Sequence, residues 1–326
     1  MGKILDVKDL RVEYRTEDGI VKALNGVNIT LNEGETLGLV GETGAGKTTL
    51  AKSIMGILPE PPAEIVSGEI IFEGEDLLKF DKTQMRDIRG KQISMIFQDP
   101  MTSLNPIMTV GDQIAEAIEA HEKLSKVEAN KRACEMLELV GITAERAGDY
   151  PHQFSGGMKQ RVVIAIALAC SPKILLADEP TTALDVTIQA QVLEMMSDLK
   201  KRFNTSTLLI THDLGVVAQN CDHASIIYAG DIVETGTVME VFKEMKHPYT
   251  IGLMNSIPKI HLEEHRLHPI GGLMPDPMAL PPGCAFSDRC EHAEERCRSE
   301  KPEMLHLGGE HYCKCFYVEE QLIGGK

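Results

Sequence analysis

The stretch GETGAGKT at residues 41–48 decides the fold of this chain, because it fits the phosphate-binding pattern G-x-x-x-x-G-K-S/T at every constrained position. The apolar run TLGLV at residues 36–40 precedes it and predicts a buried strand, and residues 49–57 predict a helix. Glycines let backbone N–H groups turn toward phosphates, and the start of a helix adds positive potential. The sequence therefore predicts a site for a nucleoside triphosphate.

Each constrained residue of this loop has an expected role. Lys47 reaches the terminal phosphates of the nucleotide, and the hydroxyl of Thr48 ligates Mg²⁺. The backbone of the whole loop and the first turn of the helix surround the phosphates. The predicted nucleotide-binding residues are Gly41, Glu42, Thr43, Gly44, Ala45, Gly46, Lys47, Thr48 and Thr49.

Composition limits the classes of function. The chain has 326 residues, of which 43% are hydrophobic, enough for one large α/β domain and a smaller module. A formal net charge of −16 argues against sequence-independent binding of nucleic acid, because no basic stripe is present to neutralise phosphates. The longest apolar run, residues 162–170, is too short for a membrane span, and the start MGKILDVKDL does not resemble a signal peptide. We therefore expect a cytoplasmic chain whose membrane link, if any, is made through a partner.

The rest of the chain follows α/β order around the phosphate loop. Residues 4–14 and 21–31 alternate apolar and polar side chains, as two strands of an antiparallel hairpin do. From about residue 99 to residue 154, apolar residues recur at three- and four-residue steps, which predicts an inserted helical subdomain. Strands and helices then alternate again up to a closing hairpin at residues 226–234. This order predicts that residues 1–245 form an α/β nucleotide-binding domain, and that this domain includes an antiparallel β subdomain.

The composition changes beyond residue 246. His, Pro, Gly and Cys become frequent, and five prolines fall between Pro269 and Pro282. Prolines and glycines at this density interrupt regular structure. Residues 246–326 are therefore predicted to form a connector and a small Cys-rich C-terminal module, and not a continuation of the sheet.

A second motif supplies acidic groups. ILLADE at residues 174–179 predicts an apolar strand that ends in two acids. Asp178 is expected to hold Mg²⁺, and Glu179 to orient or deprotonate the attacking water. Buried strands that end in exposed acids are common, so this motif has meaning only beside a phosphate loop.

A third motif, FSGGMKQR at residues 154–161, predicts another anion site. It places Ser155, Gly156 and Gly157 at the N-terminus of a helix. One triphosphate does not need two such sites in the same chain. The second site is therefore expected to serve the nucleotide of a neighbouring copy.

With these motifs in this order, the chain resembles the ATP-binding cassette (ABC) family of P-loop ATPases from about residue 4 to residue 240. The resemblance implies two cassettes arranged head to tail, with ATP clamped between the phosphate loop of one and Ser155–Gly157 of the other. Tyr14 falls where the family stacks an aromatic ring on adenine, and packing against the sheet is the alternative reading of its spacing. The implied catalytic residues are Lys47, Gln98, Glu179 and His212; the implied Mg²⁺ ligands are Thr48, Gln98 and Asp178; and the loop after the acids is Ala183–Leu184–Asp185.

The region after residue 246 narrows the resemblance. HPYTIGLMNSIP at residues 247–258, RLHPIGGLMPDP at residues 266–277 and LPPGCAFSDRC at residues 280–290 are similar to the C-terminal extension of ATPases in dipeptide and oligopeptide importers. The motif PIGGLMPDP differs slightly from the isoleucine–proline–glycine sequence that is usual in that extension. The resemblance implies a cytoplasmic ATPase, peripheral on the inner face of the cell membrane, that powers peptide import. Its implied partners are a second, non-identical ATPase, two membrane permeases that face residues 98–111, and an extracytoplasmic peptide-binding protein.

Two other functions remain open at this point. Nickel uptake by a closely related importer is the first alternative. It stays open because the substrate is selected by the binding protein and the channel. A soluble ABC protein that acts on nucleic acid or ribosomes is the second alternative, although such proteins usually carry two cassettes or a long coiled coil. This chain has one cassette and no extended heptads. The residues do not determine the transported substrate or the identity of the partner ATPase.

Five of the eight cysteines lie close together near the C-terminus. Cys284, Cys290 and Cys297 are separated by five and six residues, and Cys315 follows later. The resemblance implies that these four thiolates hold a 4Fe–4S cluster, with Cys313 as the alternative fourth ligand. Zinc is the main rival, although structural zinc sites usually pair cysteines two to four residues apart. Free thiols or disulfides are the third possibility, and a reducing cytosol disfavours disulfides.

Overall fold

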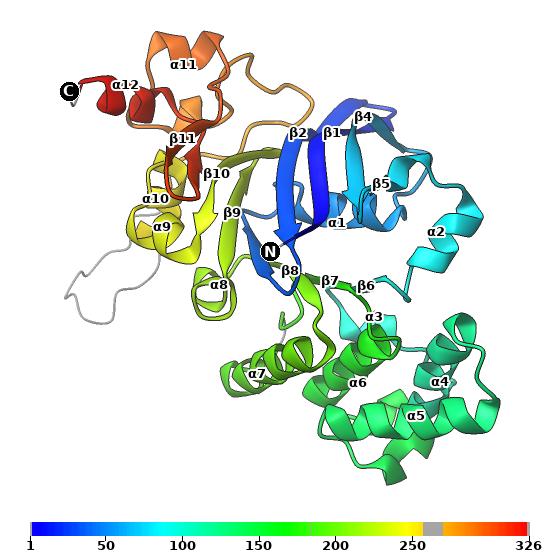
Figure 1. The fold of residues 1–326 in the computed structure, drawn as a ribbon. Coiled ribbons are helices and arrows are strands. Elements are labelled where there is room, and N and C mark those ends of the chain that lie inside the picture. Colours follow the sequence, from blue (N-terminus) through cyan, green and yellow to red (C-terminus); the bar gives the residue numbers. More distant parts are fainter. Residues whose placement is uncertain (1, 183, 257–269, 325–326) are drawn as a thin grey trace.

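The computed structural model describes residues 2–182, 184–256 and 270–324. It contains two β-sheets, a group of helices inserted between strands of the larger sheet, and a C-terminal region of short elements (Figure 1). The α/β class, the antiparallel β subdomain and the helical subdomain predicted from the sequence are all present. Ala183 and residues 257–269, which include the junction between two of the C-terminal motifs, lie outside the described residues.

The smaller sheet is antiparallel and has the strand order β2–β1–β4–β5. Leu5 and Val7 of β1 pair with Leu31 and Ile29 of β2, and all four side chains are buried. Because one face of the hairpin is buried, this alternation sets the register and confirms the predicted hairpin. The strands are β1 (Lys3–Thr16), β2 (Gly19–Asn32), β4 (Ala63–Phe72) and β5 (Glu75–Asp76).

The larger, central sheet has eight strands in the order β11–β12–β10–β9–β3–β8–β7–β6. From β9 to β6 the neighbouring strands are parallel. Every residue of β3, β6, β7 and β8 is buried, because strands inside a parallel sheet are packed on both faces. Their carboxyl ends meet at one edge, so the loops after β3, β7 and β8 lie side by side. The parallel strands are β3 (Thr36–Val40), β6 (Ile93–Ile96), β7 (Ile174–Asp178), β8 (Ser206–Thr211) and β9 (His223–Tyr228).

The C-terminal extension continues the central sheet, so the prediction that it lies outside the sheet was wrong. Strand β10 (Asp231–Thr237) is antiparallel to β9, β12 (His311–Cys313) pairs with β10, and β11 (Leu305–Gly308) pairs with β12. The ring of His311 lies 2.8 Å from the fully buried carboxylate of Glu234. Without β12, strand β10 would be an edge with unpaired N–H and C=O groups. Strands as short as β11 and β12 show no period in a sequence, which is why the pattern missed them.

Helices connect the strands of the central sheet. In the inserted region, α3 (Pro100–Ser103), α4 (Val110–His121) and α5 (Lys126–Leu139) contact α6 (Gly156–Leu168) and form an apolar cluster with it, separate from the core between the two sheets. This cluster confirms the predicted helical subdomain. The other helices are α1 (Lys47–Met55), α2 (Lys82–Ile88), α7 (Val186–Phe203), α8 (Leu214–Asn220), α9 (Val238–Lys243), α10 (Pro248–Asn255), α11 (Glu295–Ser299) and α12 (Phe316–Gly324), and the short 3₁₀ helices are η1 (Leu77–Lys79), η2 (Ala144–Gly148), η3 (Pro151–Gln153) and η4 (Ser287–Arg289).

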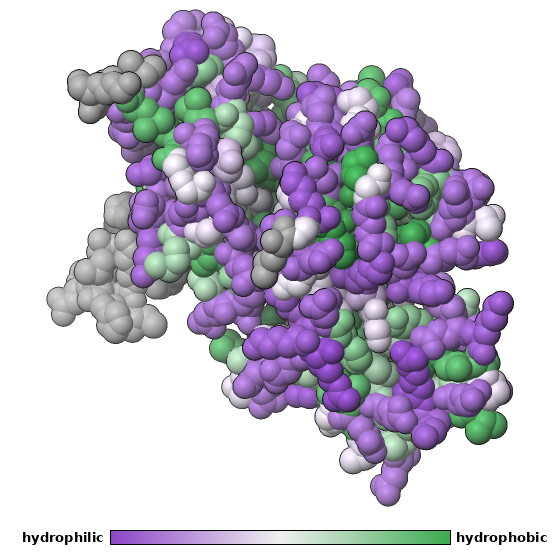
Figure 2. All heavy atoms as spheres, in the orientation of Figure 1, coloured by the Kyte–Doolittle hydropathy of each residue, from purple (hydrophilic) through white to green (hydrophobic). Residues whose placement is uncertain are grey.

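The helical subdomain and the C-terminal extension lie at opposite edges of the central sheet, beyond β6 and β10 respectively (Figure 1). The face shown in Figure 2 is mainly hydrophilic, with apolar residues in small separate groups. Among the described helices, none combines the length and apolar character needed to cross a bilayer.

Candidate active site

The phosphate loop lies between the end of β3 and the start of α1, as predicted. Gly41 has no room for a side chain, because a Cβ there would overlap the carbonyl oxygen of Ile227. Lys47 is only 6% exposed, and its Nζ donates to the carbonyl oxygens of Gly41 at 2.7 Å and Glu42 at 3.0 Å. Burial lowers the pKa of Lys47, and nearby carboxylates, Glu179 above all, oppose this effect. The ammonium group is therefore held over the loop, next to the place where phosphates are expected.

Thr48 and Asp178 come together as the predicted Mg²⁺ site requires. The Thr48 hydroxyl donates to Oδ2 of Asp178 at 2.7 Å, and Asp178 is buried at the end of β7. Burial raises the pKa of Asp178, and the hydrogen bond from Thr48 opposes that shift. Hydroxyl and carboxylate oxygens are ligands that Mg²⁺ accepts, so this pair fits the ion. Gln98, the third predicted ligand, directs its amide nitrogen to Glu179 instead.

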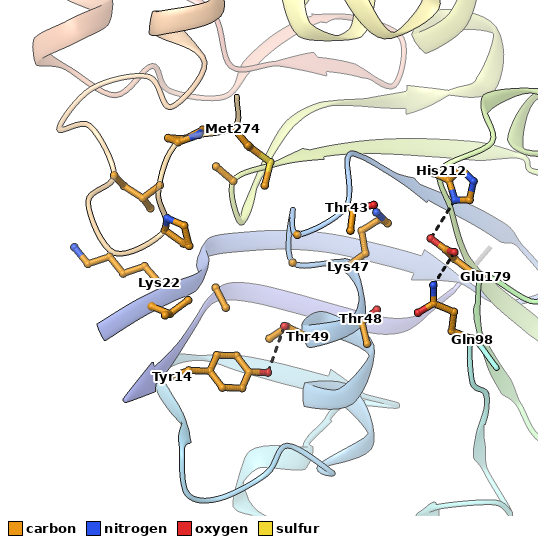
Figure 3. Close-up of a pocket in the computed structure, with 18 residues that line it drawn as sticks. Tyr14, Lys22, Thr43, Lys47, Thr48, Thr49, Gln98, Glu179, His212 and Met274 are labelled. Carbon is orange, nitrogen blue, oxygen red and sulfur yellow. Dashed lines mark hydrogen bonds and ion pairs between the residues drawn. The ribbon is translucent and has the colours of Figure 1, made fainter. Parts of the chain in front are cut away.

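Glu179 is the most constrained acid of the site. Its φ angle is 49°, in the left-handed region that residues other than glycine seldom adopt. Its carboxylate accepts a hydrogen bond from Gln98 at 3.0 Å and lies 3.1 Å from Nδ1 of His212 (Figure 3). It also accepts a hydrogen bond from the hydroxyl of Thr182 at 2.9 Å. Burial by itself would raise the pKa of Glu179, but the contacts with Thr182 and His212 outweigh burial and lower it. Glu179 is therefore ionised at neutral pH and able to accept a proton.

A cavity of about 510 Å³ connects these groups. Tyr14 lines the side of the cavity opposite Glu179, and the Tyr14 hydroxyl lies 3.4 Å from the hydroxyl of Thr49 (Figure 3). A base-stacking aromatic must lie on such a wall, and stacking on adenine stays a prediction. The predicted site residues that line the cavity are Tyr14, Thr43, Gly44, Gly46, Lys47, Thr48, Thr49, Gln98, Glu179 and His212.

Ser155, Gly156 and Gly157 do not line this cavity. They begin α6, where the Ser155 hydroxyl accepts a hydrogen bond from the backbone N–H of Met158 at 3.4 Å. Ser155 and Gly156 are exposed. An exposed helix start, separate from the cavity of its own chain, is what a site for another copy's nucleotide requires.

The C-terminal extension forms one wall of the cavity. This contact was not predicted from the sequence. Met274, Pro275, Pro277 and Leu280 line the cavity together with the phosphate loop. The backbone N–H of Lys22 donates to the carbonyl oxygen of Pro277 at 3.0 Å and fixes this segment in place. Figure 3 shows Met274 on the C-terminal side of the cavity, facing the loop. The motif PIGGLMPDP was the one feature of the sequence that marked this segment, and a motif of this kind does not show which residues the segment contacts.

The C-terminal cysteines predicted as ligands influence one another. The pKa of Cys284 is raised to about 12, first by burial and then by the nearby Cys315, Cys297 and Cys290. Among residues 2–182, 184–256 and 270–324, however, no three His, Cys, Asp or Glu side chains are placed to hold a metal ion. The four cysteines are therefore neighbours without being gathered around a single point.

Backbone N–H groups near the sulfurs of three of these four cysteines lower the pKa of each thiol, against the effect of burial. In each case a donor belongs to the residue two positions after the cysteine. Cys313, by contrast, is buried in β12, and its pKa is raised first by burial and then by the charge of Glu234. The donor and sulfur pairs are Phe286 with Cys284, His292 with Cys290, and Tyr317 and Val318 with Cys315.

Two family models match this chain. One, described as ABC transporter, matches residues 24–182, and the other, described as oligopeptide/dipeptide transporter, C-terminal region, matches residues 233–297. The oligopeptide transport ATP-binding protein OppD of Bacillus subtilis is 52% identical over 97% of this chain and 89% of its own length. The dipeptide transport ATP-binding protein DppD of the same organism is 48% identical over 98% of this chain and 96% of its own length. OppD of Escherichia coli is also 48% identical, over 98% and 95% of the two chains.

Solved structures share the cassette part of the fold. The ATP-binding cassette MJ0796, described as a dimer in a post-hydrolysis state bound to ADP and Pi, has a TM-score of 0.65 at 27% identity. The similarity covers 72% of this chain and 98% of that one. The cbiO1 protein of Clostridium perfringens, part of the transporter complex cbiONQ, has a TM-score of 0.65 at 29% identity and covers 78% and 96% of the two chains.

Proposed function

This chain belongs to the ABC transporter family, with the oligopeptide and dipeptide transport ATP-binding proteins as its near full-length relatives, and from this we propose that it hydrolyses ATP to power peptide import. The observation that carries the peptide assignment is the match of residues 233–297 to the C-terminal region of oligopeptide and dipeptide transporters. Together with the relatives, it favours peptide import over nickel uptake and over action on nucleic acid or ribosomes. The membrane permeases and a substrate-binding protein are the partners that such a subunit serves.

The residues of the site divide the work of hydrolysis. Lys47 and the loop N–H groups bind phosphate oxygens, and Thr48 and Asp178 would hold Mg²⁺, which when bound neutralises phosphate charge. Glu179 is ionised and fixed from two sides, so it accepts the proton of the attacking water. His212 contacts the second oxygen of that carboxylate and fixes its orientation.

We assign Ser155, Gly156 and Gly157 to the nucleotide of a second ATPase in a head-to-tail pair. The exposed start of α6 and its separation from the chain's own cavity support this. The related cassette MJ0796 was solved as a dimer bound to ADP and Pi. We further propose that the second ATPase is a different chain, so that the working importer contains two non-identical cassettes on the cytoplasmic face of the membrane.

Residues 98–111 are proposed to contact the permeases. Ile107 is 82% exposed, although it is a large apolar residue. Pro106 is exposed and Met108 is half-buried beside Ile107. This apolar segment begins at Gln98, which bonds Glu179, so a force on the segment reaches the hydrolytic site directly.

The test is peptide uptake by the complete importer reconstituted in liposomes with ATP inside. Met108→Asp or Pro106→Asp is expected to lower uptake per ATP hydrolysed by about tenfold or more, because an uncompensated charge at an apolar contact costs at least about 1.4 kcal/mol. Basal ATP hydrolysis by the variant cassette should stay near wild type.

Val127→Asp is the matched control, because Val127 is 78% exposed on α5 of the same subdomain but lies outside residues 98–111. It should leave uptake unchanged. Unchanged coupling in the Met108 and Pro106 variants would remove the docking assignment, and a wild-type importer that moves no peptide would remove the proposed function.

We propose that Cys284, Cys290, Cys297 and Cys315 hold a 4Fe–4S cluster. Their nearness supports it, because Cys315, Cys297 and Cys290 all act on the pKa of Cys284. Nearby backbone N–H groups also support it, since hydrogen bonds to cluster-bound sulfurs stabilise the ligated thiolates. A single zinc ion draws its ligands to about 2.3 Å, whereas a four-iron cube separates its four thiolates more widely.

Anaerobically purified protein is expected to be brown and to contain about four irons per chain, since one such cluster contains four. Cys315→Ser should lose most of this iron, because serine is a poor cluster ligand. Iron analysis and the visible absorption spectrum measure both effects.

Cys313→Ser is the matched control, because Cys313 lies two residues away, buried in β12 and paired with Glu234 of β10, and it should keep its iron. Colourless protein with one zinc per chain would overturn the cluster. Loss of iron in the Cys313 variant alone would move the fourth ligand to that residue.

A further inference from the structure

Arg289 connects the C-terminal extension to the phosphate loop. Its side chain is only 6% exposed, and Nη1 donates to Oε2 of Glu42 at 3.1 Å and to the hydroxyl of Tyr228 at 3.2 Å. Its Nε donates to the carbonyl oxygen of Gly271 at 2.9 Å. One guanidinium group therefore joins the phosphate loop, the end of β9 and the segment that leads into the cavity wall.

Glu42 is held at each of its polar groups. Its backbone N–H donates to the hydroxyl of Tyr249 at 3.0 Å, its carbonyl oxygen accepts from Lys47 at 3.0 Å, and its carboxylate accepts from Arg289. Its carbonyl oxygen also accepts from the backbone N–H of Ala45 at 3.1 Å. Tyr249 belongs to α10 and Arg289 to η4, so two of the four partners come from beyond residue 246. The second residue of the phosphate loop is thus fixed in part by the C-terminal extension.

The same extension closes one side of the nucleotide cavity. Met274 lines the cavity, and a Cβ at Gly44 of the phosphate loop would lie 3.3 Å from the Met274 methyl group. Gly271, which accepts the Arg289 bond, is three residues before Met274. Arg289 therefore holds the loop and the wall in one arrangement.

Charge makes this arrangement important for ATP. A carboxylate at the second position of a phosphate loop repels the polyphosphate unless a cation neutralises it, and Glu42 is only partly exposed to screening water. Arg289 is the cation paired directly with this carboxylate, while the ammonium group of Lys47 lies nearby and bonds the Glu42 carbonyl oxygen. We propose that Arg289 is a positioning residue for ATP binding, which neutralises Glu42 and fixes the phosphate loop against the C-terminal extension. This inference rests on the proposed ATPase function but does not depend on the iron–sulfur cluster.

The test measures MgATP affinity by isothermal titration calorimetry in the Glu179→Gln background, so that nucleotide is not consumed. Arg289→Gln is expected to weaken MgATP binding roughly tenfold, since it removes a charge-assisted hydrogen bond and exposes the phosphates to a bare carboxylate. In the protein that keeps Glu179, Arg289→Gln should raise KM for ATP by a similar factor. It should leave kcat within about twofold of wild type, because Arg289 does not touch the reacting atoms.

The double variant Arg289→Gln with Glu42→Gln decides the mechanism. If the unpaired carboxylate is the cause, removing it should restore MgATP affinity to within about threefold of wild type, a non-additive result that contacts through Tyr228 and Gly271 alone would not produce. Arg289→Lys keeps the positive charge and should lose less affinity than Arg289→Gln, and it serves if the Gln variant does not fold. Arg296→Gln is the matched control, because Arg296 pairs with Glu319 within the same module.

Unchanged affinity in Arg289→Gln, or a double variant no better than the single one, would overturn the inference. A wild-type chain that binds no MgATP would instead remove the proposed function, so the two failures are distinguishable.

Discussion

Glu179→Gln is expected to lower ATP hydrolysis by about 10²–10⁴-fold, because the amide keeps the shape of the side chain but cannot accept the proton of the attacking water. Binding should be spared, since Glu179 does not belong to the phosphate loop. The pKa of Glu179 is lowered by its contacts with Thr182 and His212 despite burial, so the native side chain is ready as a base at neutral pH. Steady-state hydrolysis and MgATP affinity, measured on the same preparation, check both halves of this expectation.

Glu73→Gln is a suitable control for that experiment. Glu73 also has a φ angle of 49°, but it is an exposed residue paired with Lys173 and does not line the nucleotide cavity. Its replacement should leave hydrolysis within about twofold, because exposed ion pairs contribute about 1 kcal/mol or less. A Glu179→Gln variant that keeps more than about a tenth of the wild-type rate would show that another group activates the water.

Lys47→Ala is expected to weaken MgATP binding by about 10–100-fold. The variant removes a charge-assisted hydrogen bond to phosphate, which contributes about 1.5–3 kcal/mol. It also removes the side-chain donor to the carbonyl oxygens of Gly41 and Glu42, and it removes a positive charge near the carboxylates of Glu179 and Asp178. Equilibrium binding of MgATP at fixed ionic strength is the measurement.

Lys22→Ala separates this effect from a general loss of positive charge. Lys22 also lines the cavity, but its side chain is exposed, so water and salt screen it. Its removal should change MgATP affinity by less than about threefold. Equal losses in the two variants would mean that Lys47 acts only through net charge and not through its place over the loop.

Much of the candidate site could be predicted because its residues lie at the ends of recognisable elements. The loop after β3, the acids after β7 and His212 after β8 follow buried strands that are neighbours in a parallel sheet. Local patterns predicted Lys47, Asp178 and Glu179, and the family resemblance implied His212. The carboxyl ends of neighbouring parallel strands bring all four to one edge of the sheet. Thr182, which bonds Glu179, was missed because a threonine in a loop carries no signal of its own.

The C-terminal half of the site could not be predicted in the same way. The pairing of β12 with β10 and the bond from Arg289 to Glu42 join residues that are far apart in the chain. An arginine beside a cysteine has many possible partners, and only the packing of η4 against β9 selects one of them. The Cys-rich region was recognised from its spacing, but its attachment to the edge of the central sheet was not.

The sequence by itself determined the α/β class, the phosphate loop, the acids and the helical insertion, because each depends on a pattern of neighbouring residues and on strand ends that a parallel sheet brings together. Only the tertiary structure decided that the C-terminal extension joins the central sheet, forms a wall of the nucleotide cavity and holds Glu42 through Arg289 and Tyr249. Those contacts depend on how distant surfaces fit and on which buried charges need a partner, and no local spacing records either property.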